Sequence, residues 1–187
     1  SENLVLADYE FTAYKSKTKT TKKTKENKET SEIVISGLET VEEKTAFATG
    51  LVVGEYVNKA RDISNLSASD MTPEALGQAA KDFVKGTKAT VKVLGKKELE
   101  KLKMGALLAV GSGTRLDTKL VIVEYWGAGK PIAKSKNSEK LKPIVLVGKG
   151  VTYDTGGLNV KPSGAMHEMH MDMSGGASAL ATIALVA

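Results

Sequence analysis

The sequence contains no cysteine, and aromatic residues make up only 5% of it. Without cysteine the chain can form no disulfide framework, no thiolate nucleophile and no thiolate metal site. No apolar run approaches the roughly 18 residues that a membrane span needs, and no charged-then-apolar signal segment is visible near the first residue. We therefore expect a cytoplasmic protein with no membrane partner.

Positive charge is concentrated in one short segment. Residues 15–28 hold seven lysines and one glutamate, a net charge of +6, whereas the formal charge of the whole chain is +5. The pI of about 9.2 therefore describes this segment and not the surface of the fold. A Lys/Thr-rich run without aromatics is typical of a solvated loop or hairpin tip, so we expect no nucleic-acid partner; an electrostatic tether to nucleic acid or an acidic surface is the alternative.

Capping residues and hydrophobic spacing predict the order of helices and strands. Helices are expected at 42–63, after the capping residue Thr40, and at 73–84, where Thr72 and Pro73 form a helix start. Shorter helices are expected at 96–102 and 177–187. Strands are expected at 4–14 and 32–35, joined as a hairpin with a basic tip, and at 89–94, 120–125 and 144–147, the last of them fully buried.

Strands that are separated by helices predict an α/β fold. We expect a three-layer α/β/α sandwich around a mixed, largely parallel sheet. Sheets of this kind bind ligands at the carboxyl ends of their strands. A glycine-rich stretch follows the predicted strand at 144–147, so a site is expected there.

Two lysines and two aspartates alternate along this glycine-rich stretch, in the order Lys149, Asp154, Lys161 and Asp172. The P-loop pattern of Gly-x-x-x-x-Gly-Lys-Ser/Thr is absent, which argues against a phosphate site. Two interpretations of the four residues remain. The aspartates are hard oxygen ligands that suit divalent metal ions, or they are turn residues beside solvated lysines.

Read as a whole, the motif favours the metal site. VGKGVTYDTGGLNVKPS, followed by MHMDMSGGASAL, resembles the leucine aminopeptidase family of dinuclear-metal peptidases in residue type and in spacing. Weaker resemblance runs through MTPEAL, GALLAVGSG and LVIVEYWG, and covers most of the chain from about residue 42. The resemblance implies that Lys149, Asp154 and Asp172 ligate two divalent ions, Zn²⁺ or Mn²⁺ with Mg²⁺ or Co²⁺ as alternatives, and that Lys161 is catalytic without being a ligand.

The activity that the resemblance implies is release of leucine-like N-terminal residues from peptides, by attack of a metal-bridging hydroxide. Lysine ligates a metal only as the neutral amine, and deprotonation at pH 7 costs roughly 4 to 5 kcal/mol from a reference pKa near 10.4. A neighbouring dication and a desolvated pocket would offset this cost at Lys149. Lys161 would stay charged and hydrogen-bond the developing oxyanion. The implied partners are peptides with a free N-terminus and, in the full-length family, further copies in a homo-hexamer.

The sequence holds only part of such a site. Two divalent ions carry a charge of +4, while Asp154 and Asp172 supply −2, so further carboxylates are expected. In the family they come from a later N-T-D-A-E-G-R motif, which this sequence lacks. We therefore predict a fragment of such a peptidase, or one whose partner segment is a separate chain, and expect it to be inactive alone. The alternatives are a catalytically inactive aminopeptidase-like module that binds peptide or nucleic acid, and a nucleotide-binding α/β domain.

The resemblance also predicts a domain division. Residues 1–40 are expected to be the remnant of an N-terminal α/β domain with the basic hairpin, 41–70 a linker helix and loop, and 71–187 the N-terminal part of the catalytic domain. His167 and His170 are three residues apart and not four, so they do not form the paired histidines of a zinc-peptidase helix. We expect both on the surface beside the site, with an auxiliary ligand role as the alternative.

Overall fold

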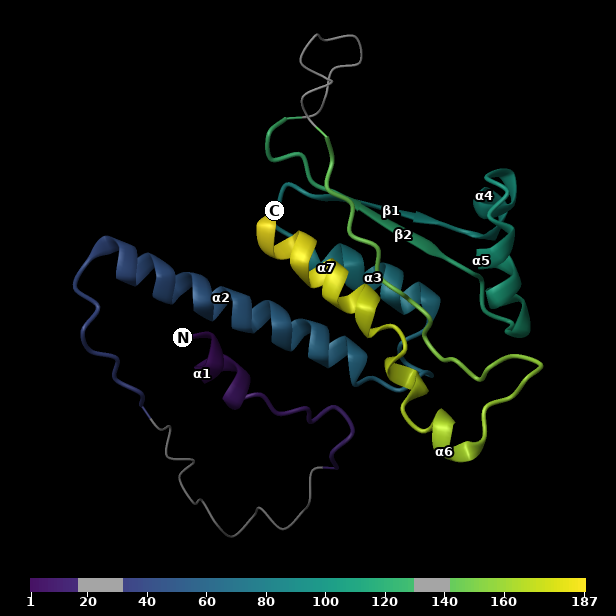
Figure 1. Cartoon of the computed structure of the whole chain (residues 1–187), viewed down its shortest axis with the longest axis horizontal. Coiled ribbons are helices and arrows are strands. Elements are labelled where there is room, and N and C mark those ends of the chain that lie inside the picture. The colour runs from purple at the N-terminus through teal and green to yellow at the C-terminus, as the bar shows by residue number, and fades with distance from the viewer. Residues whose placement is uncertain (17–31, 130–141) are drawn as a thin grey trace.

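The computed structural model describes residues 1–16, 32–129 and 142–187. Within these ranges the chain is mostly helical, with one two-stranded sheet (Figure 1). The elements are α1 (Glu2–Ala7), α2 (Val41–Ser64), α3 (Pro73–Phe83), β1 (Thr90–Leu94), α4 (Lys96–Lys101), α5 (Gly105–Val110), η2 (Gly111–Gly113), β2 (Leu120–Glu124), α6 (Ser163–Met166), η4 (Met169–Met171) and α7 (Ser174–Val186). Most of the basic run lies outside the described residues, so its loop or hairpin-tip character stays a prediction.

The predicted helices are confirmed, and local hydrogen bonds explain where they begin. The Thr40 hydroxyl accepts a hydrogen bond from the Glu43 N–H at 3.2 Å, and the Glu43 carboxylate accepts one from the Thr40 N–H at 2.9 Å. This capping box satisfies two backbone donors at the start of α2. At α3 the Thr72 hydroxyl accepts from the Ala75 N–H at 3.2 Å, and Pro73 occupies the first turn.

The core lies where α7 packs between α2 on one side and α3 with the sheet on the other (Figure 1). The apolar helix α7 buries Ala177, Leu180, Ala181 and Ala184. Its small residues allow neighbouring helices to approach closely, and an apolar helix needs such cover. The buried cluster is completed by Met71, Leu76, Ala80, Phe83, Val84 and Met173. No helix among the described residues is long and apolar enough to cross a membrane.

The sheet differs from the prediction. Strands β1 and β2 form where expected, but they pair antiparallel, in a register from Thr90 opposite Glu124 to Leu94 opposite Leu120. A parallel neighbour requires a crossover connection along the sheet. Here α4, α5 and η2 stay at one end of the strands, so the chain returns as an antiparallel neighbour (Figure 1). The largely parallel sheet of a three-layer sandwich is therefore not present in the described residues.

The predicted buried strand at 144–147 is also wrong for the described structure. The segment has no strand assignment, and Ile144 and Val147 are each 91% exposed. An apolar, β-branched run shows that a segment can enter a sheet, but a strand forms only when a neighbour offers backbone hydrogen bonds. Neither β1 nor β2 pairs with this segment.

The predicted N-terminal hairpin is replaced by a helix that packs against α2. No strand forms at 4–14 or at 32–35. Instead α1 lies so close to α2 that a Cβ atom added at Gly54 would come within 2.7 Å of the Val5 Cβ. The Asn58 side chain donates to the Val5 carbonyl at 3.0 Å, and Arg61 donates to the Leu6 carbonyl at 3.3 Å. These bonds satisfy carbonyl groups that the last turn of a helix leaves unpaired.

Candidate functional site

The glycine-rich loop at 148–150 packs directly on the first turn of α7. The Gly176 N–H donates to the Lys149 carbonyl at 2.7 Å. A Cβ atom added at Gly148 would lie 2.4 Å from the Gly175 oxygen and 2.6 Å from the Gly176 Cα. Backbone can approach backbone this closely only where side chains are absent. The glycines therefore bring the two halves of the motif together.

One lysine–aspartate pair forms at this contact. The Lys149 ammonium lies 2.8 Å from Oδ2 of Asp172, a residue that sits between η4 and α7. The lysine side chain is 56% exposed and the aspartate side chain 18% exposed. The Asp172 carboxylate raises the pKa of Lys149 above its ordinary value, because it favours the charged ammonium. Oδ2 of Asp172 is buried, and within the described ranges it has no partner besides this ion pair.

The second pair joins Asp154 to Lys161 at 3.0 Å. Asp154 also accepts a hydrogen bond from the Gly156 N–H at 2.8 Å. This backbone bond, followed by the bond from Lys161, lowers the pKa of Asp154, because both stabilise the carboxylate. The intervening turn requires glycine at 156, where φ is +86° and an added Cβ would lie 2.4 Å from the Asn159 carbonyl oxygen. The turn closes where the Lys161 N–H donates to the Thr155 carbonyl at 2.9 Å.

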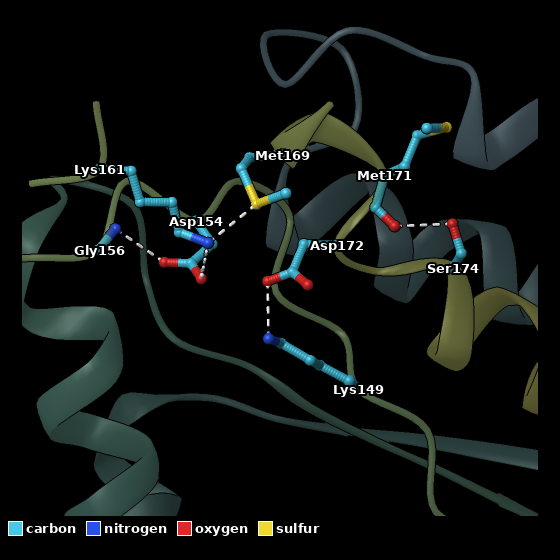
Figure 2. A network of polar contacts seen from close by, with 8 residues as sticks. All are labelled: Lys149, Asp154, Gly156, Lys161, Met169, Met171, Asp172 and Ser174. Carbon is cyan, nitrogen blue, oxygen red and sulfur yellow. Dashed lines mark hydrogen bonds and ion pairs between the residues drawn. The ribbon is translucent and has the colours of Figure 1, made fainter. Parts of the chain in front are cut away.

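A methionine adds a contact that the sequence analysis did not predict. The Lys161 ammonium donates to the sulfur of Met169 at 3.1 Å. Figure 2 shows the Met169 sulfur directed toward Lys161, whereas the side chain of Met171 points away from Asp172. The concentration of methionine and histidine between residues 166 and 173 was the available signal. The described structure thus brings all four predicted site residues into two ion pairs.

The donors present suit a divalent metal ion in kind but not in number. In the part of the chain that the structure describes, no three side chains among histidine, aspartate and glutamate converge as a metal site. The carboxylates of Asp154 and Asp172 are hard donors. Among the described residues, the buried Oδ2 of Asp172 is paired with the Lys149 ammonium alone. His167 is exposed and His170 is half-buried. The residues therefore fit one part of a metal site.

Comparison with known proteins decides the family. The catalytic-domain pattern of the cytosol aminopeptidase family matches residues 58–187. The chain belongs to the cytosol aminopeptidase family. The resemblance in the sequence motifs is thereby confirmed.

Individual members of the cytosol aminopeptidase family match most of the chain. A probable cytosol aminopeptidase from Nitrosospira multiformis is 47% identical over 152 residues, which are 79% of this chain and 28% of that protein. One from Rickettsia bellii is 36% identical over 188 residues, which are 98% of this chain and 34% of that protein. The chain therefore spans about a third of the length of these relatives.

Solved structures agree with this assignment. The bottromycin maturation enzyme BotP in complex with Mn is 28% identical, with a TM-score of 0.74 over 99% of this chain and 34% of that one. The cytosol aminopeptidase from Coxiella burnetii is 27% identical, with a TM-score of 0.72 and the same coverage of both chains. The described chain thus has the fold of one part of a cytosol aminopeptidase.

Proposed function

We propose that this chain supplies part of the active site of a metal-dependent aminopeptidase. The observation that carries the proposal is the packing of the loop at 148–150 on α7, which brings Lys149 to Asp172 in a chain of the cytosol aminopeptidase family. Lys149, Asp154 and Asp172 are proposed to hold divalent cations. Lys161 is proposed to be catalytic.

The charge state of Lys149 must change if it is to be a ligand. Asp172 raises the pKa of Lys149 above its ordinary value, so the ammonium is favoured. Lysine has no lone pair for a metal while it is protonated. A bound dication such as Zn²⁺ or Mn²⁺ would favour the neutral amine and would polarise the carbonyl of the scissile bond. Binding at this position should therefore release a proton.

Lys161 has a donor to spare. Its ammonium carries three N–H groups, of which Asp154 takes one at 3.0 Å and the Met169 sulfur takes another at 3.1 Å. The third can be donated to a carbonyl oxygen that gains negative charge during amide cleavage. The two contacts also fix the direction of a long side chain, which reduces the entropy that is lost when it engages a substrate.

Family membership also supports proposals for the substrates, the location and the assembly. The substrates would be peptides with a free N-terminus and a leucine-like first residue, the location cytoplasmic, and the assembly a homo-hexamer. The proposed domains are residues 1–40, 41–70 and 71–187. The family match begins at residue 58, inside α2.

Metal titration of site variants tests the proposal. Mn²⁺ and Zn²⁺ would be titrated calorimetrically into the 187-residue chain and into Asp154→Asn and Asp172→Asn, with the exposed residue Asp117→Asn as a matched control. We expect binding in the parent chain and in the control, and weak or no binding in the two site variants. Equal binding in all four proteins would refute the ligand assignment.

Two lysine variants separate the proposed roles. Lys149→Gln should weaken metal binding, because a ligand is lost, whereas Lys161→Gln should leave binding intact. Loss of binding in Lys161→Gln would contradict its role as a non-ligand. Hydrolysis of leucine anilide would be followed in the same samples. Because the described residues supply two of the carboxylates that a two-metal site needs, rapid hydrolysis by this chain alone would refute the view that it holds only part of the site.

A further inference from the structure

The side chain of Lys161 is held near its backbone and again at its ammonium group. The Lys161 N–H donates to the Thr155 carbonyl at 2.9 Å, and the Lys161 Cγ would lie 3.1 Å from a Cβ atom added at Gly156. Among the described residues, the ammonium has two partners, the Asp154 carboxylate at 3.0 Å and the Met169 sulfur at 3.1 Å. The position of the ammonium therefore depends on these two contacts.

The two partners of the ammonium belong to different parts of the chain. Asp154 lies in the tight turn before Lys161, where its Oδ1 accepts from the Gly156 N–H at 2.8 Å and its Oδ2 faces Lys161. Met169 lies in η4, and Met173, two residues after η4, is fully buried in the core. The core thus anchors the turn that carries Met169, so a change at Asp154 leaves the methionine in place.

The two partners also differ in chemistry. Asp154 is charged and is proposed above to be a metal ligand. A carboxylate that ligates a cation shares its charge with that cation, so it attracts a neighbouring ammonium less strongly. The Met169 thioether is neutral and a weak acceptor. Hard ions such as Mn²⁺ prefer carboxylate and water as ligands, so the sulfur remains available to Lys161.

We propose that Met169 is a positioning residue for Lys161, whose sulfur keeps the ammonium in place when the charge of Asp154 is neutralised by a cation. The inference rests on the roles proposed above for Asp154 and Lys161. Because a thioether carries no charge, it directs the ammonium without neutralising the positive charge that a developing oxyanion needs. Figure 2 shows the sulfur directed toward Lys161, as this role requires.

The variant Asp154→Asn reproduces the loss of charge without any metal ion. Asparagine keeps one oxygen, which can still accept from the Gly156 N–H, and replaces the oxygen that faces Lys161 by an NH₂ group. The turn is thereby preserved while the ion pair is removed. The sulfur of Met169 is then the remaining partner of the ammonium in the described structure.

Three methionine variants would be combined with Asp154→Asn. Met169→Leu nearly conserves volume and removes the acceptor. Met169→Gln supplies an amide oxygen as acceptor on an unbranched side chain. Met171→Leu is the matched control, because Met171 is also half-buried and its side chain points away from Asp172 (Figure 2).

The mobility of the Lys161 ε-methylene group reports whether the ammonium is held. It would be measured by NMR relaxation in the 187-residue chain with isotope-labelled lysine. The spectrum of Lys161→Arg identifies the Lys161 signal by its absence. The exposed residue Lys97 in α4 gives the mobility of a solvated lysine.

In Asp154→Asn we expect Lys161 to stay more restricted than Lys97. Adding Met169→Leu should remove this restriction, to the level of Lys97. Adding Met169→Gln should retain it, and adding Met171→Leu should leave it unchanged. A Lys161 as mobile as Lys97 in Asp154→Asn alone would overturn the inference, and so would a restriction that survives Met169→Leu.

Titration with Mn²⁺ separates this inference from the peptidase proposal. Met169→Leu should bind Mn²⁺ as the parent chain does, because the methionine is not a ligand. A loss of binding as large as that in Asp154→Asn would overturn the positioning role. If the parent chain itself binds no Mn²⁺, the ligand assignment fails, and the mobility comparison still decides whether Met169 holds Lys161.

Discussion

Replacing Gly148 by alanine should separate the loop at 148–150 from α7. The added Cβ would lie 2.4 Å from the Gly175 oxygen and 2.6 Å from the Gly176 Cα. Because the atoms it meets belong to backbone, no side chain can rotate out of the way. The loop must move, and the hydrogen bond from Gly176 to the Lys149 carbonyl is lost or lengthened.

The expected cost combines two effects. Inserting a methyl group into a tightly packed contact costs about 1 to 3 kcal/mol. A lost backbone hydrogen bond adds about 1 kcal/mol. We therefore expect the free energy of unfolding to fall by roughly 2 to 4 kcal/mol. The ion pair of Lys149 with Asp172 should weaken when the loop moves, because Lys149 lies in that loop.

Urea unfolding followed by circular dichroism measures this effect. The midpoint should fall, while the slope with denaturant stays near that of the parent chain. Gly164→Ala is the control, because an added Cβ there meets nothing within 4 Å and the position lies inside α6. That change should be neutral or stabilising by up to about 1 kcal/mol. Equal midpoints for the Gly148 variant, the control and the parent chain would refute the argument from close packing.

Two further predictions concern the scaffold. Leu99 in α4 is fully buried, so Leu99→Ala should lower the free energy of unfolding by about 2 to 5 kcal/mol; a thermal midpoint unchanged from the parent would contradict this. The pKa of Glu43 is lowered below its ordinary 4.5 by hydrogen bonds from the Thr40 and Glu39 N–H groups. A lowered carboxyl pKa stabilises the fold above pH 4.5 and loses this contribution as pH falls through the folded pKa. The parent should therefore be more stable than Glu43→Gln at neutral pH, with the difference shrinking in acid; a constant difference from pH 7 to about pH 3 would argue against it.

Helices could be predicted because their signals are local. Thr40 and Thr72 accept hydrogen bonds from residues only three positions along the chain, so the sequence near each start contains the whole interaction. The short helices α5 and α6 were not predicted, and α1 was predicted as a strand. The position of α1 depends on contacts with Gly54, Asn58 and Arg61, more than 45 residues away, and no local pattern reveals such packing.

The positions of the two strands could be predicted from the sequence better than the way in which they pair. The two strands that pair were located within a residue of their ends, but their antiparallel direction depends on α4 and α5 remaining at one end of the sheet. The segment at 144–147 has the composition of a buried strand and yet pairs with neither β1 nor β2. The hydrophobic pattern indicates which side chains a segment can bury. Whether the segment pairs as a strand depends on whether the edge of a sheet lies beside it.

The site was predicted as a set of residues but not as a set of contacts. Lys149, Asp154, Lys161 and Asp172 were found from motif spacing, and the structure joins them as two pairs. Which lysine meets which aspartate follows from the tight turn at Gly156 and the close approach at Gly148. The contact of Lys161 with Met169 spans α6 and the turn that follows it, so spacing alone did not identify it.

The exposed segment at 144–147 has a consequence for strand register. Its four residues are all apolar, so both of its faces are equally suited to burial. A shift of one residue exchanges the faces of a strand, and here the exchange would carry no penalty in hydrophobicity. The segment is anchored two residues after its end, where the Lys149 carbonyl accepts a hydrogen bond from the Gly176 N–H. This bond holds the end of the segment against α7, so it limits how far the segment can slide along a neighbouring strand, which its uniformly apolar side chains do not.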